Sequence, residues 1–295
     1  PSIRRLGPLE WTYPLPDHVS ENMNGATLFR VPDRVEGRLG QYYLYFARHE
    51  GQYIRMAHAD AVTGPWTFLE GGVLHRDACP WVATHIASPD LRIEPDRRIV
   101  MYFHGDMTDP KGQFTFRAES VDGVTFTPAP DRLGTFYFRH FEHGGTVYAL
   151  GKARIYRSGD GGRSFEHGPL VYPLSPETPG QIGHQALRHS AVLVDDDLAH
   201  VVFSRIGDAP EALRYGTMDL SGPWRDWLIE DHGVILSPDA DFEGGDMPAV
   251  PSQEGKIMEF QRALRDPHLF QDNGTTYLVY SYGGEAGLAL AEITF

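Results

Sequence analysis

The chain has 295 residues, of which 41% are hydrophobic and 12% aromatic, so it can bury a large core as one β-rich domain or two smaller domains. Its formal net charge of −14, with 40 acidic and 26 basic residues and no Lys/Arg-rich run, excludes nucleic acid and an anionic membrane surface as partners. The sequence contains no apolar run near the ~20 residues of a membrane helix and opens without the apolar core of a signal peptide. We therefore expect a cytoplasmic protein; secretion would require that a leader preceded Pro1. The single cysteine, Cys79, cannot form an internal disulfide and is expected to be a small buried side chain.

Five runs of alternating aromatic and β-branched residues predict strands, whereas helical periodicity is scarce. In chain order they are "QYYLYFAR" (41–48), "RRIVMYFHG" (97–105), "GTVYALG" (145–151), "LAHVVFSRIG" (198–207) and "TTYLVYSYGG" (275–284). Each follows a polar signature and a short apolar strand: "NGATLFRV" from 24, "HIASPDLRI" from 85, "RHFEHG" from 139, "RHSAVLV" from 188 and "RDPHLFQ" from 265. The signatures are 61, 54, 49 and 77 residues apart, somewhat above the ~40–50 residues of a propeller blade.

Two turns in the second and third units have a further structural signature. "SVDGVTF" (120–126) and "SGDGGRSF" (158–165) resemble the Asp-box hairpin turn of propellers, in which the Asp caps backbone amides and the aromatic packs between sheets. We therefore assign Asp122 and Asp160 to structure and exclude them from the active site.

Five similar four-stranded units predict an all-β fold, a single five-bladed β-propeller domain over residues 1–295. The expected blades cover approximately 24–70, 85–130, 135–170, 187–230 and 264–295. The last unit has only three strands after Arg265, and residues 1–13 precede the first unit. We predict that the N-terminal strand completes the last blade, closes the ring and covers an edge that would otherwise aggregate. A two-sheet sandwich is the alternative, but it does not explain five similar units.

Propeller geometry gathers two kinds of position at one end of the central axis. The innermost strand of each blade begins there, and the turn between the second and third strands returns to the same end. The strand starts contribute Asn24, His85, Asp90, Arg139, His140, Arg188, His189, Arg265 and Asp266, and the turns contribute Arg48, His49, His104, Asp106, Lys152, Arg205, Asp208, Glu211 and Glu285. Because packing alone does not require so many ionisable groups, we predict a pocket at this end. The alternative is that they form ion pairs which seal an axial water channel.

Two of these segments resemble known enzymes. "RDP" at 265–267 followed by "GTTYLVYS", together with "HIASPD" at 85–90, resembles the five-bladed propeller glycoside hydrolases of the arabinanase/xylosidase and invertase/levansucrase groups. The chain as a whole is most similar to bacterial glycosidase-related propellers of unspecified activity. The resemblance implies hydrolysis of a terminal sugar of a glycan or oligosaccharide by three acidic groups in the axial funnel, with no cofactor required. It assigns Asp266 to the carboxylate that binds sugar hydroxyls and stabilises the transition state, and Asp90 to a second acidic position.

The chain departs from those hydrolases at two of the acidic positions. The first blade opens with Asn24-Gly25 where they usually have an Asp, and the third opens with Arg139-His140 where a Glu is expected. If another residue replaces the missing carboxylic acid, we expect it in the Gly/Pro-rich insertion at 238–260 before the last blade, because long loops are often functional. Glycoside hydrolysis needs two carboxyls. The predicted catalytic pair is Asp266 with Glu243, supported by Asp90 or Glu285.

The histidines suggest a different chemistry. His85, His140 and His189 open three successive blades, and with a carboxylate they would hold a divalent metal ion near the axis. Such a metal with a His or Tyr base could eliminate across a uronic acid, so a metal-assisted uronate lyase is the second hypothesis. The third is a sugar-binding propeller without catalysis, since the Asp and Glu expected in the first and third blades are missing.

We expect the remaining polar groups of the funnel to bind a carbohydrate. The predicted substrate-binding residues are Asn24, Arg48, His49, His104, Arg139, Arg188, Arg205, Asp208 and Arg265. Guanidinium groups match carboxylates and sulfates bidentately, so five arginines at one mouth suggest an anionic sugar; they could equally neutralise the carboxylates of the site. The sequence leaves the sugar, the linkage and the oligomeric state open.

Overall fold

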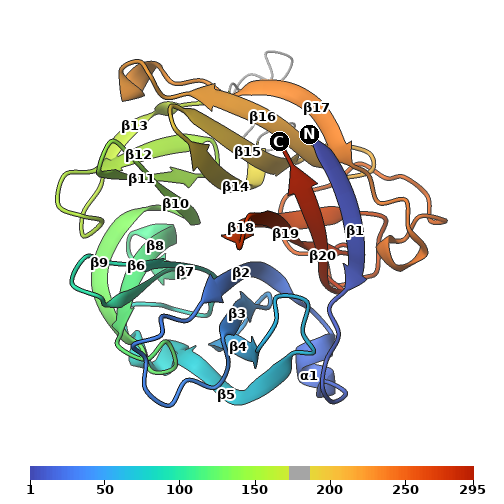
Figure 1. Ribbon diagram of the computed structural model, residues 1–295, viewed down its shortest axis with the longest axis horizontal. Coiled ribbons are helices and arrows are strands. Elements are labelled where there is room, and N and C mark those ends of the chain that lie inside the picture. The colour runs from blue at the N-terminus through green and yellow to red at the C-terminus, as the bar shows by residue number, and fades with distance from the viewer. Residues whose placement is uncertain (173–186) are drawn as a thin grey trace.

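The computed structural model describes residues 1–172 and 187–295 and consists of five four-stranded antiparallel sheets arranged around a central axis (Figure 1). From the axis outward, the first blade comprises β2 (Asn24–Arg30), β3 (Tyr42–Ala47), β4 (Tyr53–Ala59) and β5 (Thr67–His75), and the second β6 (Ile86–Ile93), β7 (Ile99–Thr108), β8 (Lys111–Ser120) and β9 (Thr127–Thr135). The third comprises β10 (Phe138–His143), β11 (Thr146–Gly151), β12 (Arg154–Ser158) and β13 (Glu166–Leu170), and the fourth β14 (Leu187–Asp195), β15 (Leu198–Arg205), β16 (Leu213–Asp219) and β17 (Glu230–Leu236). The fifth comprises β18 (Leu264–Asp272), β19 (Thr275–Tyr282), β20 (Gly287–Thr294) and β1 (Ser2–Pro8).

The helical segments within the described residues are short. They are α1 (Asp17–Ser20) and the single 3₁₀ turns η1 (Arg76–Ala78), η2 (Trp224–Asp226) and η3 (Asp241–Glu243). None of these helices is long and apolar enough to cross a membrane. The all-β five-bladed propeller predicted from the repeat is thus confirmed.

The N-terminal strand closes the ring as the unfinished last unit predicted. Strand β1 pairs antiparallel with β20, in a register that runs from Ser2 opposite Thr294 to Pro8 opposite Ala289. Both ends of the chain therefore lie in one blade, side by side (Figure 1). The pairing covers the outer edge of β20, which would otherwise be open to other chains.

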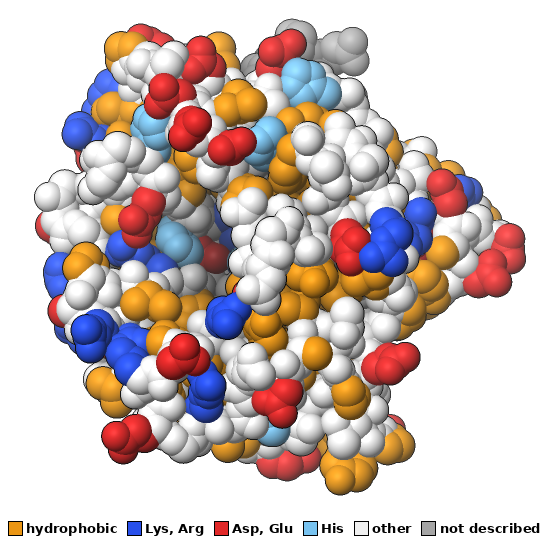
Figure 2. Space-filling model, viewed as in Figure 1, with side chains coloured by type: hydrophobic (Ala, Val, Ile, Leu, Met, Phe, Trp, Pro, Cys, Tyr) orange, Lys and Arg blue, Asp and Glu red, His pale blue; other side chains and the backbone are white. Residues whose placement is uncertain are grey.

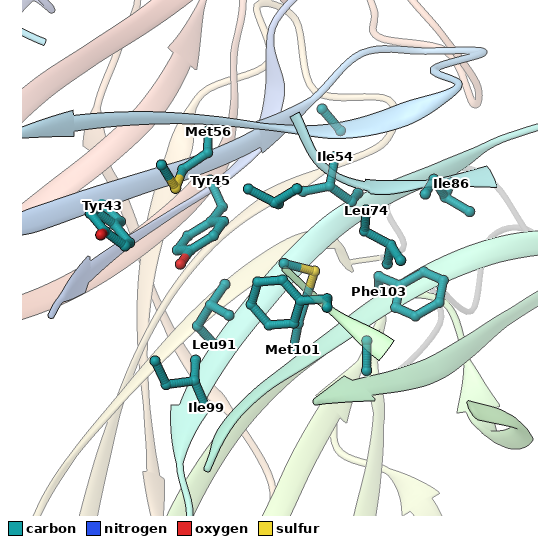
Figure 3. Packing of buried hydrophobic residues seen from close by; sticks show 14 of the residues in the cluster. Tyr43, Tyr45, Ile54, Met56, Leu74, Ile86, Leu91, Ile99, Met101 and Phe103 are labelled. Atoms are coloured by element: carbon teal, nitrogen blue, oxygen red, sulfur yellow. The ribbon is translucent and has the colours of Figure 1, made fainter. Parts of the chain in front are cut away.

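The core lies between the blades, which explains the aromatic and β-branched composition of the strands. Alternate side chains of a strand point to opposite faces of its sheet, and each face packs on a neighbouring blade. Strand β3 is therefore buried at all six of its residues. Between the first two blades, Tyr45 and Met56 pack against Leu91 and Met101 (Figure 3). Similar clusters fill the other spaces between blades, so the ring has no single centre of packing.

The two Asp-box turns have the structural role predicted for them. The Oδ1 atom of Asp122 accepts the backbone N–H groups of Val124 and Thr125 at 2.8 and 2.9 Å, and Phe126 packs edge-on against Tyr45 of the first blade. In the third blade, the Oδ1 atom of Asp160 accepts the backbone N–H groups of residues 163 and 164 at 3.0 and 2.9 Å.

A repeated bulge shapes the innermost strands. The pairing of β2, β6, β14 and β18 with the next strand shifts register close to the start of each strand. At the bulge, Gly25, Ser88 and Asp266 share a left-handed backbone with φ of 58°, 50° and 50°. A Cβ atom on Gly25 would lie 2.8 Å from the Ser88 Cα atom, so this position requires glycine. A bulge redirects the side chain at that point, and only the fifth blade has a carboxylate there.

The insertion before the last blade has two separate parts. Its first part contains Glu243, whose side chain is fully buried beside the N-terminal strand rather than in a cavity. The carboxylate accepts hydrogen bonds from Arg5 at 2.9 and 3.0 Å and from Tyr280 at 2.8 Å. Glu243 therefore joins β1 to the insertion and β19, which differs from the catalytic position predicted from the sequence. The second part, around residues 252–257, returns to the axis.

Candidate functional site

A cavity of about 510 Å³ lies at the end of the axis where the innermost strands begin. Its lining comprises Asn24, His49, Glu50, His85, Ala87, Ser88, His104, Gln113, Phe136, Tyr137, Lys152, Arg188, His189, Ile206, Glu254, Gly255, Lys256, Asp266 and Glu285. A second cavity, lined by the later halves of the same strands, lies at the opposite end of the axis. Figure 2 shows one face of the ring, which is hollowed over the axis and carries acidic and basic side chains interspersed, with no broad basic area.

Asp266 lies at the start of β18, where the bulge places its carboxylate against the first cavity. The side chain is almost fully buried. The Oδ1 atom accepts the Tyr137 hydroxyl at 2.9 Å and lies 2.9 Å from Nδ1 of His189, while Oδ2 has a longer hydrogen bond from Ser281 at 3.3 Å. Burial alone would raise the pKa of Asp266, but His189 and the nearby Arg265 charge lower it below its usual range. Asp266 is therefore ionised at neutral pH and has acceptor capacity to spare on Oδ2.

Glu285 lies in the turn between β19 and β20 and lines the same cavity. Its carboxylate accepts the side-chain amides of Asn22 and Asn24, each at 3.0 Å, and approaches the Nε2 atom of His49 at 3.0 Å and Nη1 of Arg265 at 3.3 Å. Burial and the charge of Asp266 oppose ionisation, but the hydrogen bond and charge of His49 outweigh them and lower the pKa of Glu285. The two carboxylates are thus close enough to influence each other, and both are ionised.

A stack of aromatic and imidazole rings forms one wall of the cavity. Tyr137 lies between His104 and His189, with ring centroids 5.9 and 4.9 Å away. Burial lowers the pKa of His104 well below its usual value, so this ring is neutral. His85, whose Nδ1 atom lies 3.3 Å from Asp106, also has a pKa lowered by burial. Apolar ring faces beside polar atoms are typical of sites that bind sugars and other small polar molecules.

The second part of the insertion contributes to the mouth of the cavity. Lys152 pairs with Glu254 at 3.2 Å, and Lys256 pairs with Glu50 of the first blade. The carbonyl of Gly255 accepts long hydrogen bonds from Arg188 and Arg265, each at 3.4 Å. The insertion therefore lines the cavity through residues 254–256, whereas Glu243, the acid predicted from this insertion, does not line it.

The cavity brings together about half of the residues predicted for the site. Those that line it are Asn24, His49, His85, His104, Arg188, His189, Asp266 and Glu285. Those that do not line it are Arg48, Asp90, Arg139, His140, Arg205, Asp208, Glu243 and Arg265.

Arg139 and Asp90 lie farther along the axis than the strand starts suggested. The Arg139 guanidinium fills the axis, where it donates to the hydroxyl of Thr27 at 2.8 Å and to the carbonyls of Ala26, Pro89 and Ser190 at 3.1–3.2 Å. Asp90 is two residues beyond the bulge of β6, so its side chain lies at the second cavity instead of the first. It pairs there with His140 at 2.7 Å.

The other predicted arginines also have partners within the protein. Arg265 is fully buried and pairs with Glu211 at 2.8 Å and Glu285 at 3.3 Å, beneath the cavity. Arg205 pairs with Asp208 at 2.7 Å. Arg48 donates to the carbonyl of residue 18. Arg188 pairs with Glu211 at 2.9 Å. The ion pairs of Arg265, Arg205 and Arg188 fit the alternative in which arginines neutralise carboxylates of the protein.

The three histidines predicted to hold a metal do not converge. His85 and His189 line the first cavity, whereas His140 lines the second. Each is paired with a different aspartate, at 3.3, 2.9 and 2.7 Å. Across residues 1–172 and 187–295, no three His, Cys, Asp or Glu side chains come together as a metal site.

Several cavity residues were not identified from the sequence. Tyr137 and Phe136 lie just before the innermost strand of the third blade. Asn22, which does not line the cavity but donates to Glu285, lies just before that of the first. These residues belong neither to the strand starts nor to the turns between second and third strands, where the site was predicted. Polar and aromatic residues in the segments that lead into those strands are the signal that could have found them.

The chain matches no protein family at the level of family profiles. It is 29% identical over 297 residues to the uncharacterized protein R118 of Acanthamoeba polyphaga mimivirus, a match covering 92% of this chain and 83% of the relative. Among solved structures it is similar to a family-43 β-xylosidase/α-arabinofuranosidase from a compost metagenome, in complex with xylotriose, with 13% identity, a TM-score of 0.66 and coverage of 98% and 96% of the two chains.

Two further structures have the same architecture. The family-43 enzyme of Xanthomonas citri, complexed with xylose, is 14% identical with a TM-score of 0.65 and coverage of 98% and 91%. The α-L-arabinanase of Cellvibrio cellulosa, complexed with arabinohexaose, is 13% identical with a TM-score of 0.57 and coverage of 93% and 92%. The protein therefore has the five-bladed propeller fold of the family-43 glycoside hydrolases, as the resemblance in its motifs implied.

Proposed function

We propose that this protein is a glycoside hydrolase that acts on a terminal sugar bound in the axial cavity. One arrangement supports the proposal above all: two buried, ionised carboxylates, Asp266 and Glu285, share one cavity on the axis of a fold that xylosidases and arabinanases also have. The solved neighbours contain xylose, xylotriose or arabinohexaose, so pentose glycosides are the first substrates to test.

In this proposal Asp266 faces the anomeric carbon. Cleavage of a glycosidic bond passes through a state in which the sugar ring carries positive charge. A carboxylate that stays ionised and has a free acceptor position can stabilise that charge. Glu285 accepts hydrogen bonds at both oxygens and is better suited to hold other groups in place.

Other cavity residues would bind the sugar. Asn24 and His104 offer polar atoms, and the ring of Phe136 offers an apolar surface for the sugar ring. Two cations line the cavity, but Lys256 pairs with Glu50 and Arg188 pairs with Glu211 at 2.9 Å, so uronosides are tested beside neutral sugars to find whether an anionic group is accepted. The proposed reaction requires no cofactor.

The test is hydrolysis of a panel of aryl glycosides and oligosaccharides, including xylosides, arabinofuranosides and uronosides, by the wild type and by Asp266→Asn. Asn also tolerates the left-handed backbone at this position, so the variant should keep the fold. A carboxylate ~4 Å from a unit positive charge contributes ~4 kcal/mol at an effective dielectric constant of ~20, which corresponds to about a thousandfold in rate.

We expect the wild type to turn over at least one glycoside and Asp266→Asn to be slower by about that factor. Asp33→Asn is the matched control, because Asp33 has a side chain 89% exposed and does not line the cavity. Sugar binding without turnover would support the non-catalytic alternative, and an unsaturated product would support elimination. Either result would contradict the proposed hydrolysis.

A further inference from the structure

The cavity poses a problem for hydrolysis, because none of its described carboxyl groups is set up as an acid. A glycosidase needs a group that protonates the leaving oxygen, and this group is usually a carboxylic acid with a raised pKa. The carboxyls that line the cavity are Glu50, Glu254, Asp266 and Glu285. The pKa values of Asp266 and Glu285 are lowered, and Glu50 and Glu254 each form an ion pair with a lysine.

Among the other proton-bearing side chains of the lining, the two lysines are held in ion pairs with glutamates and the Tyr137 hydroxyl donates to Asp266, which leaves the imidazoles. His85 and His104 are buried with lowered pKa values, so they lack the proton to give. His189 uses Nδ1 to contact Asp266, the carboxylate assigned to the anomeric carbon, and its ring stacks on Tyr137. His49, in the turn between β3 and β4, pairs instead with Glu285, a carboxylate that is not assigned to the anomeric carbon, and is therefore the candidate acid.

His49 is held in place at two points. Its backbone N–H donates to the side-chain carbonyl of Asn22 at 2.9 Å, and its Nε2 atom lies 3.0 Å from Glu285. The Nδ1 atom has no hydrogen-bond partner among residues 1–172 and 187–295, and the side chain is 32% exposed where it lines the cavity. A buried carboxylate bonded to one ring nitrogen fixes the orientation of the imidazole and leaves the other nitrogen facing the cavity.

Glu285 is suited to positioning His49 and is not suited to act as a nucleophile or as a base. Its two oxygens already accept from Asn22, Asn24 and His49 and contact Arg265, which uses the acceptor positions of a carboxylate. It therefore has no oxygen left to attack a sugar or activate water, whereas Asp266 does.

On the basis of the proposed function, we propose that His49 is the general acid of this enzyme, in place of a carboxylic acid, and that Glu285 positions it. The glycosidic C–O bond breaks with its electron pair going to oxygen, which takes the proton from the His49 imidazolium. Asp266 stabilises the positive charge left on the sugar ring. Water then adds to the anomeric carbon and gives a proton to the neutral imidazole, so the imidazolium is regenerated.

The experiment measures how the rate depends on the leaving group. The wild type, His49→Gln and Glu285→Gln are compared on aryl glycosides of whichever sugar the wild type hydrolyses, from dinitrophenyl to phenyl. A dinitrophenolate departs without a proton, whereas a phenolate needs one. We expect His49→Gln to lose 10²- to 10⁴-fold on the phenyl glycoside, the usual contribution of a general acid, and little on the dinitrophenyl glycoside. For Glu285→Gln we also expect the rate to fall more steeply from the dinitrophenyl to the phenyl glycoside than in the wild type, but with a smaller loss of rate on the phenyl glycoside.

The control is His85→Gln, which removes another carboxylate-paired histidine from the cavity wall. His85→Gln can change the absolute rate, but the ratio of its rates on the dinitrophenyl and phenyl glycosides should equal that of the wild type. If His49→Gln slows all aryl glycosides equally, or does not slow the phenyl glycoside, the assignment of His49 is overturned and the proposed function stands. If the wild type hydrolyses no glycoside, both are overturned.

Discussion

Replacing Glu243 by glutamine tests whether this buried carboxylate closes the ring or takes part in catalysis. Its side chain is fully buried, and its two oxygens together accept hydrogen bonds from Arg5, Tyr280 and the backbone N–H groups of Asp239 and Ala240. A glutamine side chain has one acceptor oxygen and one NH₂ group. In either orientation the NH₂ group meets at least two of these donors, which then lose their acceptor.

The expected loss of stability follows from those contacts. Breaking a buried ion pair costs about 3–5 kcal/mol, and we expect the lower end because the Arg5 side chain is 33% exposed and can reach water. The entropy of unfolding is ~2.1 cal/mol/K per residue, or about 0.6 kcal/mol/K for 295 residues. A loss of about 3 kcal/mol therefore lowers Tm by about 5 °C.

The assay is thermal unfolding of Glu243→Gln beside Arg4→Ala, with glycosidase activity measured well below both Tm values. Arg4 is the matched control, because it lies on the same strand but its side chain is 68% exposed and its pair with Glu292 is on the surface. A surface pair contributes about 0–1 kcal/mol, so Arg4→Ala should shift Tm by less than about 2 °C. An unchanged Tm for Glu243→Gln together with a large loss of activity would refute this reasoning and return Glu243 to the catalytic role predicted from the sequence.

Two further predictions concern ionisation elsewhere in the fold. Burial would raise the pKa of Asp90, but His140 and Arg139 lower it to about 2, so its ionised form stabilises the fold at pH values above the unfolded pKa of about 3.9. This stabilisation of about 2–3 kcal/mol should be lost progressively as the pH falls from about 5 to about 1. Urea unfolding at a series of pH values should show that the free energy of unfolding falls with pH in the wild type and falls less in Asp90→Asn. An equal pH dependence of the free energy of unfolding in the two proteins would disprove this assignment. Burial raises the pKa of Cys79 to about 11, so the native thiol should resist a disulfide reagent at pH 8 and react after unfolding. Fast labelling of the folded protein would contradict this.

The architecture could be predicted from the sequence because its determinants are local. Alternating runs such as "QYYLYFAR" indicate strands that are buried on both faces, and the repeat of polar signatures counts the blades. The three-stranded last unit indicated that β1 would complete it, and the pairing of Ser2 with Thr294 confirmed this. The Asp-box turns, in which Asp122 bonds to amides two and three residues later, are also set by neighbours in the chain.

The composition of the site depends on contacts that neighbouring residues do not determine. A single bulge decides that Asp266 lies at the first cavity, while Asp90, two residues beyond the corresponding bulge of β6, lies at the second. Glu243 lies 238 residues from Arg5 in the chain, and His49 lies 236 residues from Glu285. The sequence by itself thus determined the strands, their number and the closing of the ring, because alternation and turn chemistry act over a few residues. Only the tertiary structure decided which polar groups share the cavity, because that depends on strand register and on ion pairs between blades far apart in the chain.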